Sequence, residues 1–469
     1  MSGAGALALD LGTTRVKLAR LGARGELDVL GSTAAPEPSG AGAVREVDPF
    51  AYARAAKDLL DPHRGSRAEP TPLAVACQRS SFLLWERSSG TPLTPIVSWQ
   101  DRRAAPWCER HAEREAVVKH ATGLPLSPHY VGPKLAWLFE RDSALARRAG
   151  AGELLFGTLE TWLAWRWSGG AAHVTDLSMA ARTLLVDLAS GGWSDNLLDS
   201  FGVPRALLPE IVPSAGRSLA LDGFELRASL SDQAAGVLAV LSPGEDGALV
   251  NFGTGSFVLR PSGERRLERP GYLTGPLCGG ARTLYALEGT INAGGATAAR
   301  FAEGPTGLPA ADPAPDAFCL PDENGVGAPH WLPSQGFALS AAARELPAAE
   351  QRRIVLEGLV FRARAQLDDL GALASTRILL GGGLTRDPFV AAALAAVLGR
   401  EVELLETREA TLLGAARLAA DLDPCADPRT RRVEPPAHGS WLREKFPRWL
   451  AWLARILRRP GGALLPPAC

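Results

Sequence analysis

The apolar and polar positions at the start of the chain predict an antiparallel hairpin. An apolar strand is expected over residues 4–9 and a second over 16–21, with a polar, glycine-containing turn at 10–14 between them. A further glycine turn at 22–25 leads into a third strand. A strand that returns through a tight corner differs from the strand–turn–helix unit of dinucleotide-binding folds. The corner also lacks the GxxxxGK[ST] pattern, so the sequence excludes a P-loop at this position.

The same pattern returns just past the middle of the chain, where ALVNFGTGSFVL (248–259) resembles LALDLGTTRVKL (7–18). In this match Asp10 corresponds to Asn251, Gly12 to Gly253, Thr13 to Thr254 and Leu18 to Leu259. One strand–turn–strand unit in each half predicts two related domains. The alternative is two unrelated hairpins that share only their turn chemistry.

Helical patterns fill most of the remaining chain. They cover 51–60, 107–120, 134–148 and 157–167 between the two copies, and 351–373, 388–398 and 410–422 after the second. A short strand at 378–380 runs into a triple glycine, and 304–321 reads as a surface loop. The alternation of strands and helices predicts the α/β class. We expect an N-terminal domain over 1–243, a C-terminal domain over 244–422, and a linker with a tail over 423–469.

Composition narrows the class of protein. The chain has 469 residues, of which 46% are hydrophobic and 22% charged, as in ordinary globular proteins. Lys+Arg 50 against Asp+Glu 51 leaves a net charge of −1, which gives no general attraction for nucleic acid. The six cysteines form no CxxC pair and the start lacks a basic segment with a cleavage site. These features predict a cytoplasmic, reduced protein without a structural metal.

The glycine turns have the chemistry of a phosphate site. A turn such as Gly12-Thr13-Thr14 offers backbone N–H groups and hydroxyls without a Cβ at the glycine, and Lys17 lies on the following strand. Asp10 ends the preceding strand, where a carboxylate suits a hydrated Mg²⁺. Two such hairpins that face each other would hold a nucleoside triphosphate between them. Ordinary hairpin turns are the alternative, and clearance for packing is the alternative for the triple glycine at 381–383.

From about residue 7 to 422, an ordered set of motifs resembles the FGGY family of carbohydrate kinases, in particular its glycerol kinase-like branch. The matching segments are ALDLGTT with Lys17, REVDP (45–49), CQR (77–79), SWQDRR (98–103), TGLPLSPHYVGPKLAWL (122–138), GTLETWLAWRWSGG (157–170), HVTDLSMAARTLL (173–185), SDQAAG (231–236), NFGTGSF (251–257), YALEGTINAGG (285–295), VGAPHW (326–331) and GGGLTRDPF (381–389). The resemblance implies two actin/hexokinase-like (ribonuclease H-like) domains with ATP and a small polyol or sugar in the cleft between them.

The resemblance also implies roles for individual residues. Asp232 would be the base that accepts the proton of the acceptor hydroxyl, although it could instead cap the helix that follows it. The acceptor would be bound by Gln78, Arg79, Trp99, His129, Asp232, Gln233 and Phe257. ATP would be bound by Gly12, Thr13, Thr14, Lys17, Gly253, Thr254, Gly382, Gly383 and Asp387, with Mg²⁺ held beside Asp10.

Several positions depart from the family pattern. Ser80 follows Arg79 where a glutamate is usual, and His129 takes the place of an aromatic tyrosine. Ser231 stands before the base in place of glycine. The missing carboxylate makes glycerol a less expected substrate than a larger polyol or a ketose. A catalytically silent nucleotide- or sugar-binding regulator is the alternative, and a solvent-facing loop residue is the alternative for His129.

The tail combines an apolar stripe with basic residues over 441–459. We expect Pro447 to restrict the regular helix to the residues after it. A basic aromatic stripe can lie on an anionic membrane surface, but we favour a helix docked on its own domain or on a second subunit in a homodimer.

Overall fold

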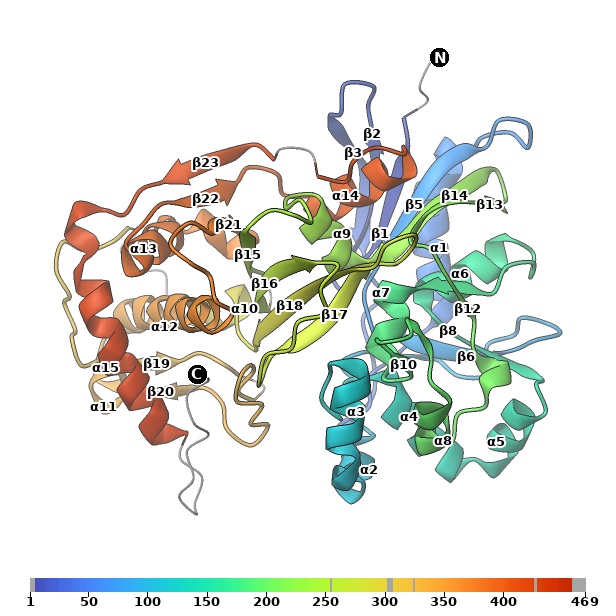
Figure 1. Cartoon of the computed structure of the whole chain (residues 1–469), viewed down its shortest axis with the longest axis horizontal. Helices are drawn as coiled ribbons and strands as arrows, with labels where there is room; N and C mark the ends of the chain where they lie inside the picture. The colour runs from blue at the N-terminus through green and yellow to red at the C-terminus, as the bar shows by residue number, and fades with distance from the viewer. Residues whose placement is uncertain (1–4, 254, 302–306, 324, 426–427, 458–469) are drawn as a thin grey trace.

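Two mixed β-sheets, one in each half of the chain, organise the fold into two lobes (Figure 1). The computed structural model describes residues 5–253, 255–301, 307–323, 325–425 and 428–457. Among these residues no helix is both long and apolar enough to span a bilayer.

The first sheet is built around β1, whose five residues LALDL are almost wholly buried. It pairs with β2 antiparallel and with β5 parallel, so it lies in the interior of the sheet. In order across the sheet, the six strands are β13 (Ala215–Leu221), β14 (Phe224–Ser231), β5 (Thr71–Cys77), β1 (Leu7–Leu11), β2 (Arg15–Leu21) and β3 (Leu27–Ala34).

The second sheet repeats this arrangement around β15. This strand pairs with β16 antiparallel and with β21 parallel. The seven strands in order are β17 (Leu273–Cys278), β18 (Leu284–Ile291), β16 (Ser256–Gly263), β15 (Gly247–Phe252), β21 (Arg377–Gly381), β22 (Val402–Leu405) and β23 (Thr430–Val433). The shared pattern of three antiparallel strands followed by parallel neighbours confirms the prediction of two related α/β units.

The two hairpins differ in the length of their turns. Asp10 lies opposite Lys17 in the first hairpin, whereas Asn251 lies opposite Phe257 in the second. The second turn is therefore one residue shorter. The expected match of Leu18 with Leu259 is wrong for this reason, and the structural counterpart of Lys17 is Phe257.

Further strands and helices enlarge the first lobe. A four-stranded sheet contains β4 (Glu46–Val47), β7 (Ile96–Val97), β6 (Phe82–Glu86) and β8 (Leu154–Thr158), and two short pairs are β9 (Val174–Asp176) with β12 (Glu210–Val212) and β10 (Val186–Asp187) with β11 (Gly192–Trp193). The helices are α1 (Pro49–Leu60), α2 (Ala105–Arg110), α3 (Glu115–Thr122), α4 (Val131–Arg141), α5 (Ser143–Gly150), α6 (Leu159–Trp167), α7 (Leu177–Ala180), α8 (Asp195–Phe201) and α9 (Asp232–Leu238).

The second half supplies the remaining elements. Its helices are α10 (Gly295–Ala298), α11 (Ala341–Arg344), α12 (Ala348–Asp369), α13 (Pro388–Leu398), α14 (Ala410–Ala419) and α15 (Trp441–Ile456), and β19 (Cys319–Leu320) pairs with β20 (Ala338–Leu339). Helices α12, α13 and α15 share one hydrophobic core with the second sheet.

Helix α14 crosses from the second half of the chain to the first sheet. It packs on α9 and on strands β1, β2, β5 and β14 (Figure 1). The strand residues that face it are small, such as Ala8 and Ala74, while alternate residues such as Leu7 and Leu73 face α1 and α6. Helices α9 and α14 approach so closely that a Cβ at Gly414 would overlap the carbonyl of Ala235. One core thus joins both sheets beneath the space between the lobes.

The C-terminal segment is part of the second lobe. Residues 430–433, within the segment expected as a linker, form the edge strand β23 against β22. Helix α15 begins at Trp441 and continues through Pro447, so the expectation that the proline delays the helix is wrong. An interior proline costs about 3 kcal/mol or more, which the burial of neighbouring side chains such as Leu442 and Trp449 offsets.

Within α15, Lys445 is fully buried with its ammonium between acidic groups. Its Nζ lies 2.7 Å from Glu357 and 3.2 Å from Asp312, and it donates to the carbonyl of Ala314 at 2.9 Å. The apolar residues Leu442, Trp449 and Leu453 of the tail lie in the core of the second lobe, so the tail docks on its own domain, which is one of the two arrangements that we favoured.

Candidate active site

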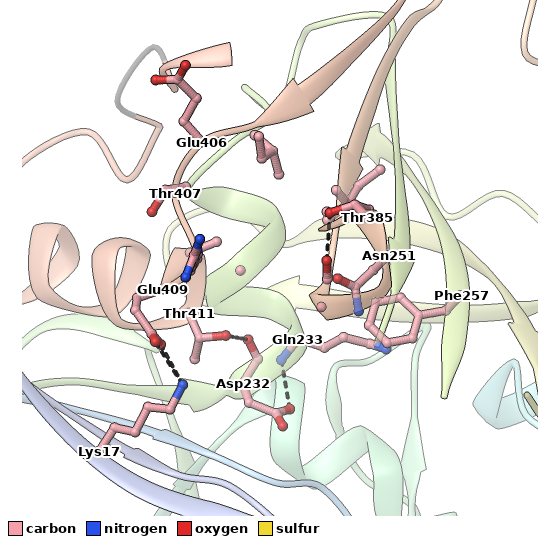
Figure 2. A pocket seen from close by; sticks show the side chains of 18 of the residues that line it. Lys17, Asp232, Gln233, Asn251, Phe257, Thr385, Glu406, Thr407, Glu409 and Thr411 are labelled. Atoms are coloured by element: carbon pink, nitrogen blue, oxygen red, sulfur yellow. Dashed lines mark hydrogen bonds and ion pairs between the residues drawn. The ribbon is translucent and has the colours of Figure 1, made fainter. Parts of the chain in front are cut away.

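A cleft of about 760 Å³ opens between the two lobes, and the starts of α9 and α14 contribute to its lining (Figure 2). Residues from both halves of the chain line it: Thr13, Lys17, Gln78, Arg79, Trp99, Asp232, Gln233, Gly236, Leu249, Asn251, Phe257, 381–383, Thr385, Arg386, 404–411 and Arg431. The cleft therefore brings together the first hairpin, the start of α9, the second hairpin and the triple glycine.

Asp232 is the first residue of α9, and its carboxylate lies in the cleft (Figure 2). The helix is capped by Ser231, whose Oγ accepts from the N–H of Ala234 at 3.3 Å. The carboxylate of Asp232 accepts from the N–H of Gln233 at 2.7 Å. The backbone carbonyl of Asp232 accepts from the hydroxyl of Thr411 at 3.1 Å. Capping therefore does not account for the side chain of Asp232. Burial raises the pKa of this carboxyl, and the charge of Arg79 opposes that effect.

A buried ion cluster supports the same wall of the cleft. Arg79 donates to both carboxylate oxygens of Glu288, on β18, at 3.2 and 3.4 Å. Arg182 donates to the same carboxylate. Burial alone would raise the pKa of Glu288, but the two guanidinium groups hold it at about 2. The cluster links the two lobes and fixes the guanidinium of Arg79, which keeps further N–H donors beside the cleft.

The first hairpin carries the charged groups at its turn. The Nζ of Lys17 lies 2.8 Å from each carboxylate oxygen of Glu409, which precedes α14 (Figure 2). Asp10 lies opposite Lys17 on β1. Burial and the neighbouring charge of Asp232 raise the pKa of Asp10 to about 8. In this arrangement Lys17 is neutralised by Glu409, and an incoming phosphate would compete for the same ammonium group.

Asp10 has the properties of a magnesium ligand. Its Oδ1 is buried and has no hydrogen-bond partner among the described residues. The same part of the chain holds no cluster of three or more histidine, cysteine or acidic side chains that could bind a metal. Mg²⁺ commonly takes one or two carboxylates, with water and substrate phosphates completing its octahedron. The single unpartnered carboxylate oxygen therefore fits a nucleotide-bound Mg²⁺.

The triple glycine and the segment 404–411 also line the cleft. Gly382 has φ +94°, and a Cβ on it would overlap the backbone of Phe252. Gly383 has open space at its Cβ position and lines the cleft. Packing clearance thus explains Gly382, whereas Gly383 keeps the cleft open.

The aromatic side of the cleft contains Trp99 and Phe257 together with the amides of Gln78 and Gln233. His129 is not among the described residues that line the cleft, and its ring instead packs on Trp99 at 5.4 Å between centroids. Burial and the nearby Lys134 place the pKa of His129 well below its usual range. His129 is partly exposed, and its ring packs between Trp99 and Tyr130.

Comparisons with known proteins identify the family of the chain. Residues 6–222 match the N-terminal domain, and residues 248–421 the C-terminal domain, of the FGGY family of carbohydrate kinases. The chain belongs to this family.

Members of the FGGY family with similar sequences include glycerol kinases. The glycerol kinase of Methylobacterium nodulans is 32% identical over 97% of this chain and 98% of its own length. That of Thermus brockianus is 35% identical over 87% and 88%. Among solved structures, the gluconate kinase of Lactobacillus acidophilus has a TM-score of 0.82 at 19% identity and covers 97% of this chain and 98% of its own. The chain is a carbohydrate kinase, and the predicted actin/hexokinase-like fold is confirmed.

Most of the site residues that the sequence predicted for this FGGY kinase line the one cleft or lie next to residues that do. Gly12 and Thr14 flank the lining residue Thr13, and Gly253 follows β15. Thr254 lies outside the described residues. Asp387 serves the fold, because its carboxylate caps α13 at the N–H of Phe389 and pairs with Arg352 at 2.7 Å.

Ser80, which stands where the family pattern has a glutamate, does not line the cleft. Its backbone has φ 62°, and its hydroxyl donates to the carbonyl of Arg182 at 3.0 Å. The side chain is therefore buried away from the cleft, and the carboxylate that accompanies Arg79 comes from Glu288.

Sequence reasoning missed Glu409, Arg182 and Glu288. Arg182 and Glu288 lie inside motifs that resemble the family, but nothing local distinguishes them from structural charges. Glu409 has no motif of its own and meets Lys17 only through the fold.

Gly382 and Gly383 offer a paired test of whether a nucleotide binds beside the triple glycine. Gly383→Ala is expected to keep the wild-type unfolding temperature and to weaken ADP binding about tenfold, because the added methyl enters the cleft. Gly382→Ala is expected to lower the free energy of unfolding by about 2 kcal/mol or more, because it is strained at positive φ and meets Phe252. Thermal unfolding and calorimetric ADP titration measure both. Equal ADP affinity in Gly383→Ala and wild type would place the nucleotide elsewhere.

Proposed function

We propose that the protein transfers the terminal phosphoryl group of ATP to a hydroxyl of a small polyol or ketose, with Asp232 as the general base. The observation that carries this proposal is the carboxylate of Asp232 at the start of α9, in a cleft shared with the phosphate-type hairpin turn and the aromatic wall.

The base acts on the acceptor. As the hydroxyl oxygen attacks phosphorus, its proton passes to the carboxylate of Asp232, the new P–O bond forms, and the bond from phosphorus to the ADP oxygen breaks. Burial raises the pKa of Asp232 and makes it a stronger base, while Arg79 favours the ionised form that the reaction needs. Ser231 performs the capping, so the carboxylate of Asp232 remains available.

The first hairpin serves the phosphates. Backbone N–H groups of the 12–14 turn and the ammonium of Lys17 are the donors for the phosphate oxygens, once Lys17 exchanges Glu409 for phosphate. Mg²⁺ held beside Asp10 would supply neutralisation of the phosphate charge. Closure of the lobes would exclude water, which otherwise competes with the acceptor.

The acceptor wall fits a polyhydroxylated molecule. Gln78, Gln233 and Arg79 offer polar groups to hydroxyls, while Trp99 and Phe257 offer apolar faces to carbon atoms. Ser80 has no carboxylate to offer the acceptor, unlike the glutamate usual at this position, and its hydroxyl is already bonded to the carbonyl of Arg182. This favours polyols larger than glycerol, or ketoses.

The test is ATP-dependent ADP release with glycerol, erythritol, pentitols, xylulose, ribulose and sedoheptulose. Turnover of one acceptor supports the proposal and identifies the substrate class. If every acceptor gives only background release while ATP still shifts the unfolding temperature, the protein is a silent binder and the proposal fails.

The raised pKa of Asp10 predicts that binding of Mg·ADP depends on pH. Below about 8 the carboxyl holds a proton, which must leave before the oxygen can bind Mg²⁺. Affinity is therefore expected to rise up to about tenfold per pH unit towards pH 8, and to level off above it. Calorimetric titrations at pH 6.5, 7.5 and 8.5 in two buffers measure affinity and proton release. Asp10→Asn should lose this dependence, and an unchanged profile in that variant would contradict the assignment.

A further inference from the structure

A continuous chain of hydrogen bonds runs beneath the acceptor side of the cleft to the phosphate turn. The indole Nε1 of Trp99 lies 3.0 Å from Thr13 Oγ1, and that hydroxyl lies 2.9 Å from Gln78 Oε1. The Nε2 of Gln78 is 2.8 Å from the hydroxyl of Tyr52, which lies 3.2 Å from the carbonyl of Gly12.

The two ends of this chain fix its direction. An indole N–H can only donate, and a backbone carbonyl can only accept. Tyr52 therefore donates to Gly12 and must accept from an N–H of Gln78, so the amide of Gln78 has one possible orientation. Thr13 accepts from Trp99 and donates to the amide oxygen. Every hydroxyl proton in this series of hydrogen bonds is therefore already donated to a partner within it.

We propose that Tyr52 is a positioning residue for the acceptor: its hydroxyl orients the amide of Gln78 so that the remaining N–H of this amide faces the cleft as a fixed donor. The inference rests on the proposed function, in which Gln78 contacts the acceptor. An acceptor oxygen at this position must then accept a hydrogen bond.

Tyr52 acts only through its neighbours. It lies on α1 and is 2% exposed, whereas Gln78 is among the residues that line the cleft. Burial raises the pKa of Tyr52 to about 12, so its hydroxyl keeps the proton that it donates to Gly12. Without this hydroxyl, Gln78 loses the partner that holds its Nε2, and the amide can rotate or reverse.

The hydrogen bond from Thr13 to Gln78 also limits what the Thr13 side chain can do. Its hydroxyl proton is used on Gln78, so the side chain offers a bound phosphate no proton while the chain is intact. Phosphate contacts in this turn therefore fall to backbone N–H groups and to Thr14.

The test compares wild type, Tyr52→Phe, Gln78→Ala and the double variant in the full-length protein, with the panel acceptor that wild type turns over fastest. Tyr52→Phe is expected to raise KM for the acceptor about 5- to 30-fold and to change KM for ATP less than about threefold. In the Gln78→Ala background, Tyr52→Phe should add less than about twofold, because its route to the acceptor is already lost. Tyr272→Phe is the matched control, since this buried hydroxyl bonds Asp369 at 2.5 Å in the second lobe.

A readout independent of turnover is the ¹⁵N–¹H resonance of the Trp99 indole, assigned by its disappearance in Trp99→Phe. Tyr52→Phe should shift this resonance, because hydrogen bonds in a chain polarise one another, and Tyr272→Phe should not. An unshifted resonance, equal rises in both KM values, or additive effects in the cycle would each overturn the inference. If wild type phosphorylates no acceptor, the proposed function fails. The resonance then decides the inference about Tyr52 and Gln78 by itself: a shift supports the coupling, and no shift overturns it.

Discussion

Asp232→Asn is expected to lower kcat by about 10²–10⁴-fold while acceptor and nucleotide affinities stay within about threefold. An asparagine keeps the size of the side chain and removes only its ability to take a proton. The helix start survives, because Ser231 caps α9 through the N–H of Ala234. Steady-state ADP release with the best acceptor measures kcat, and thermal unfolding verifies that the variant is folded.

The matched control is Asp58→Asn, on the exposed side of α1. This variant should keep kcat within about twofold of wild type, as expected for a surface substitution. A kcat for Asp232→Asn above a tenth of the wild-type value would assign the base to another group.

Lys445→Met is expected to lower the free energy of unfolding by about 3–5 kcal/mol. The lysine is fully buried in α15, and its removal leaves the carboxylates of Glu357 and Asp312 without its charge. Among the residues that the structure describes, Glu357 then keeps only Arg353 as a cationic partner. Denaturant unfolding of the full chain measures the change.

Lys57→Met removes a lysine from an exposed ion pair and is the matched control for Lys445→Met. Lys57, on α1, pairs with Asp61 just after the helix, and their side chains are 56% and 40% exposed. Its loss should change stability by less than about 1 kcal/mol. If the two variants were equally stable, the buried cluster would contribute nothing to the docking of α15.

The features that the sequence predicts well are local. Strand–turn–strand units follow from a few neighbouring residues, so both hairpins and the duplication were predictable. The register of the second hairpin was not, because Phe257, Val258 and Leu259 are all apolar and their pattern does not show which of them faces the core.

The missed site residues depend on distant partners. Glu409 meets Lys17 only after α14 crosses to the first sheet. Glu288 meets Arg79 and Arg182 in the same way, across the lobes. Pairings of this kind leave no periodicity or spacing in the chain.

The departures from the family pattern at Ser80 and His129 were visible in the sequence, but the directions of their side chains were not. Ser80 could have faced the cleft, yet its positive φ turns its hydroxyl to Arg182. His129 supports Trp99 from behind the lining. Which side of a residue meets the cleft is set by backbone geometry that composition does not encode.

The crossing of α14 has a consequence for synthesis on the ribosome. The first sheet ends at Ser231, but the helix that covers its alanine face is completed only at Ala419. At bacterial or eukaryotic elongation rates, about 10–40 s pass between the synthesis of that face and the synthesis of the helix that covers it. During this interval the nascent chain presents an apolar surface to chaperones and to other chains. Yield of the folded protein should therefore depend on how quickly translation passes through the second half of its message.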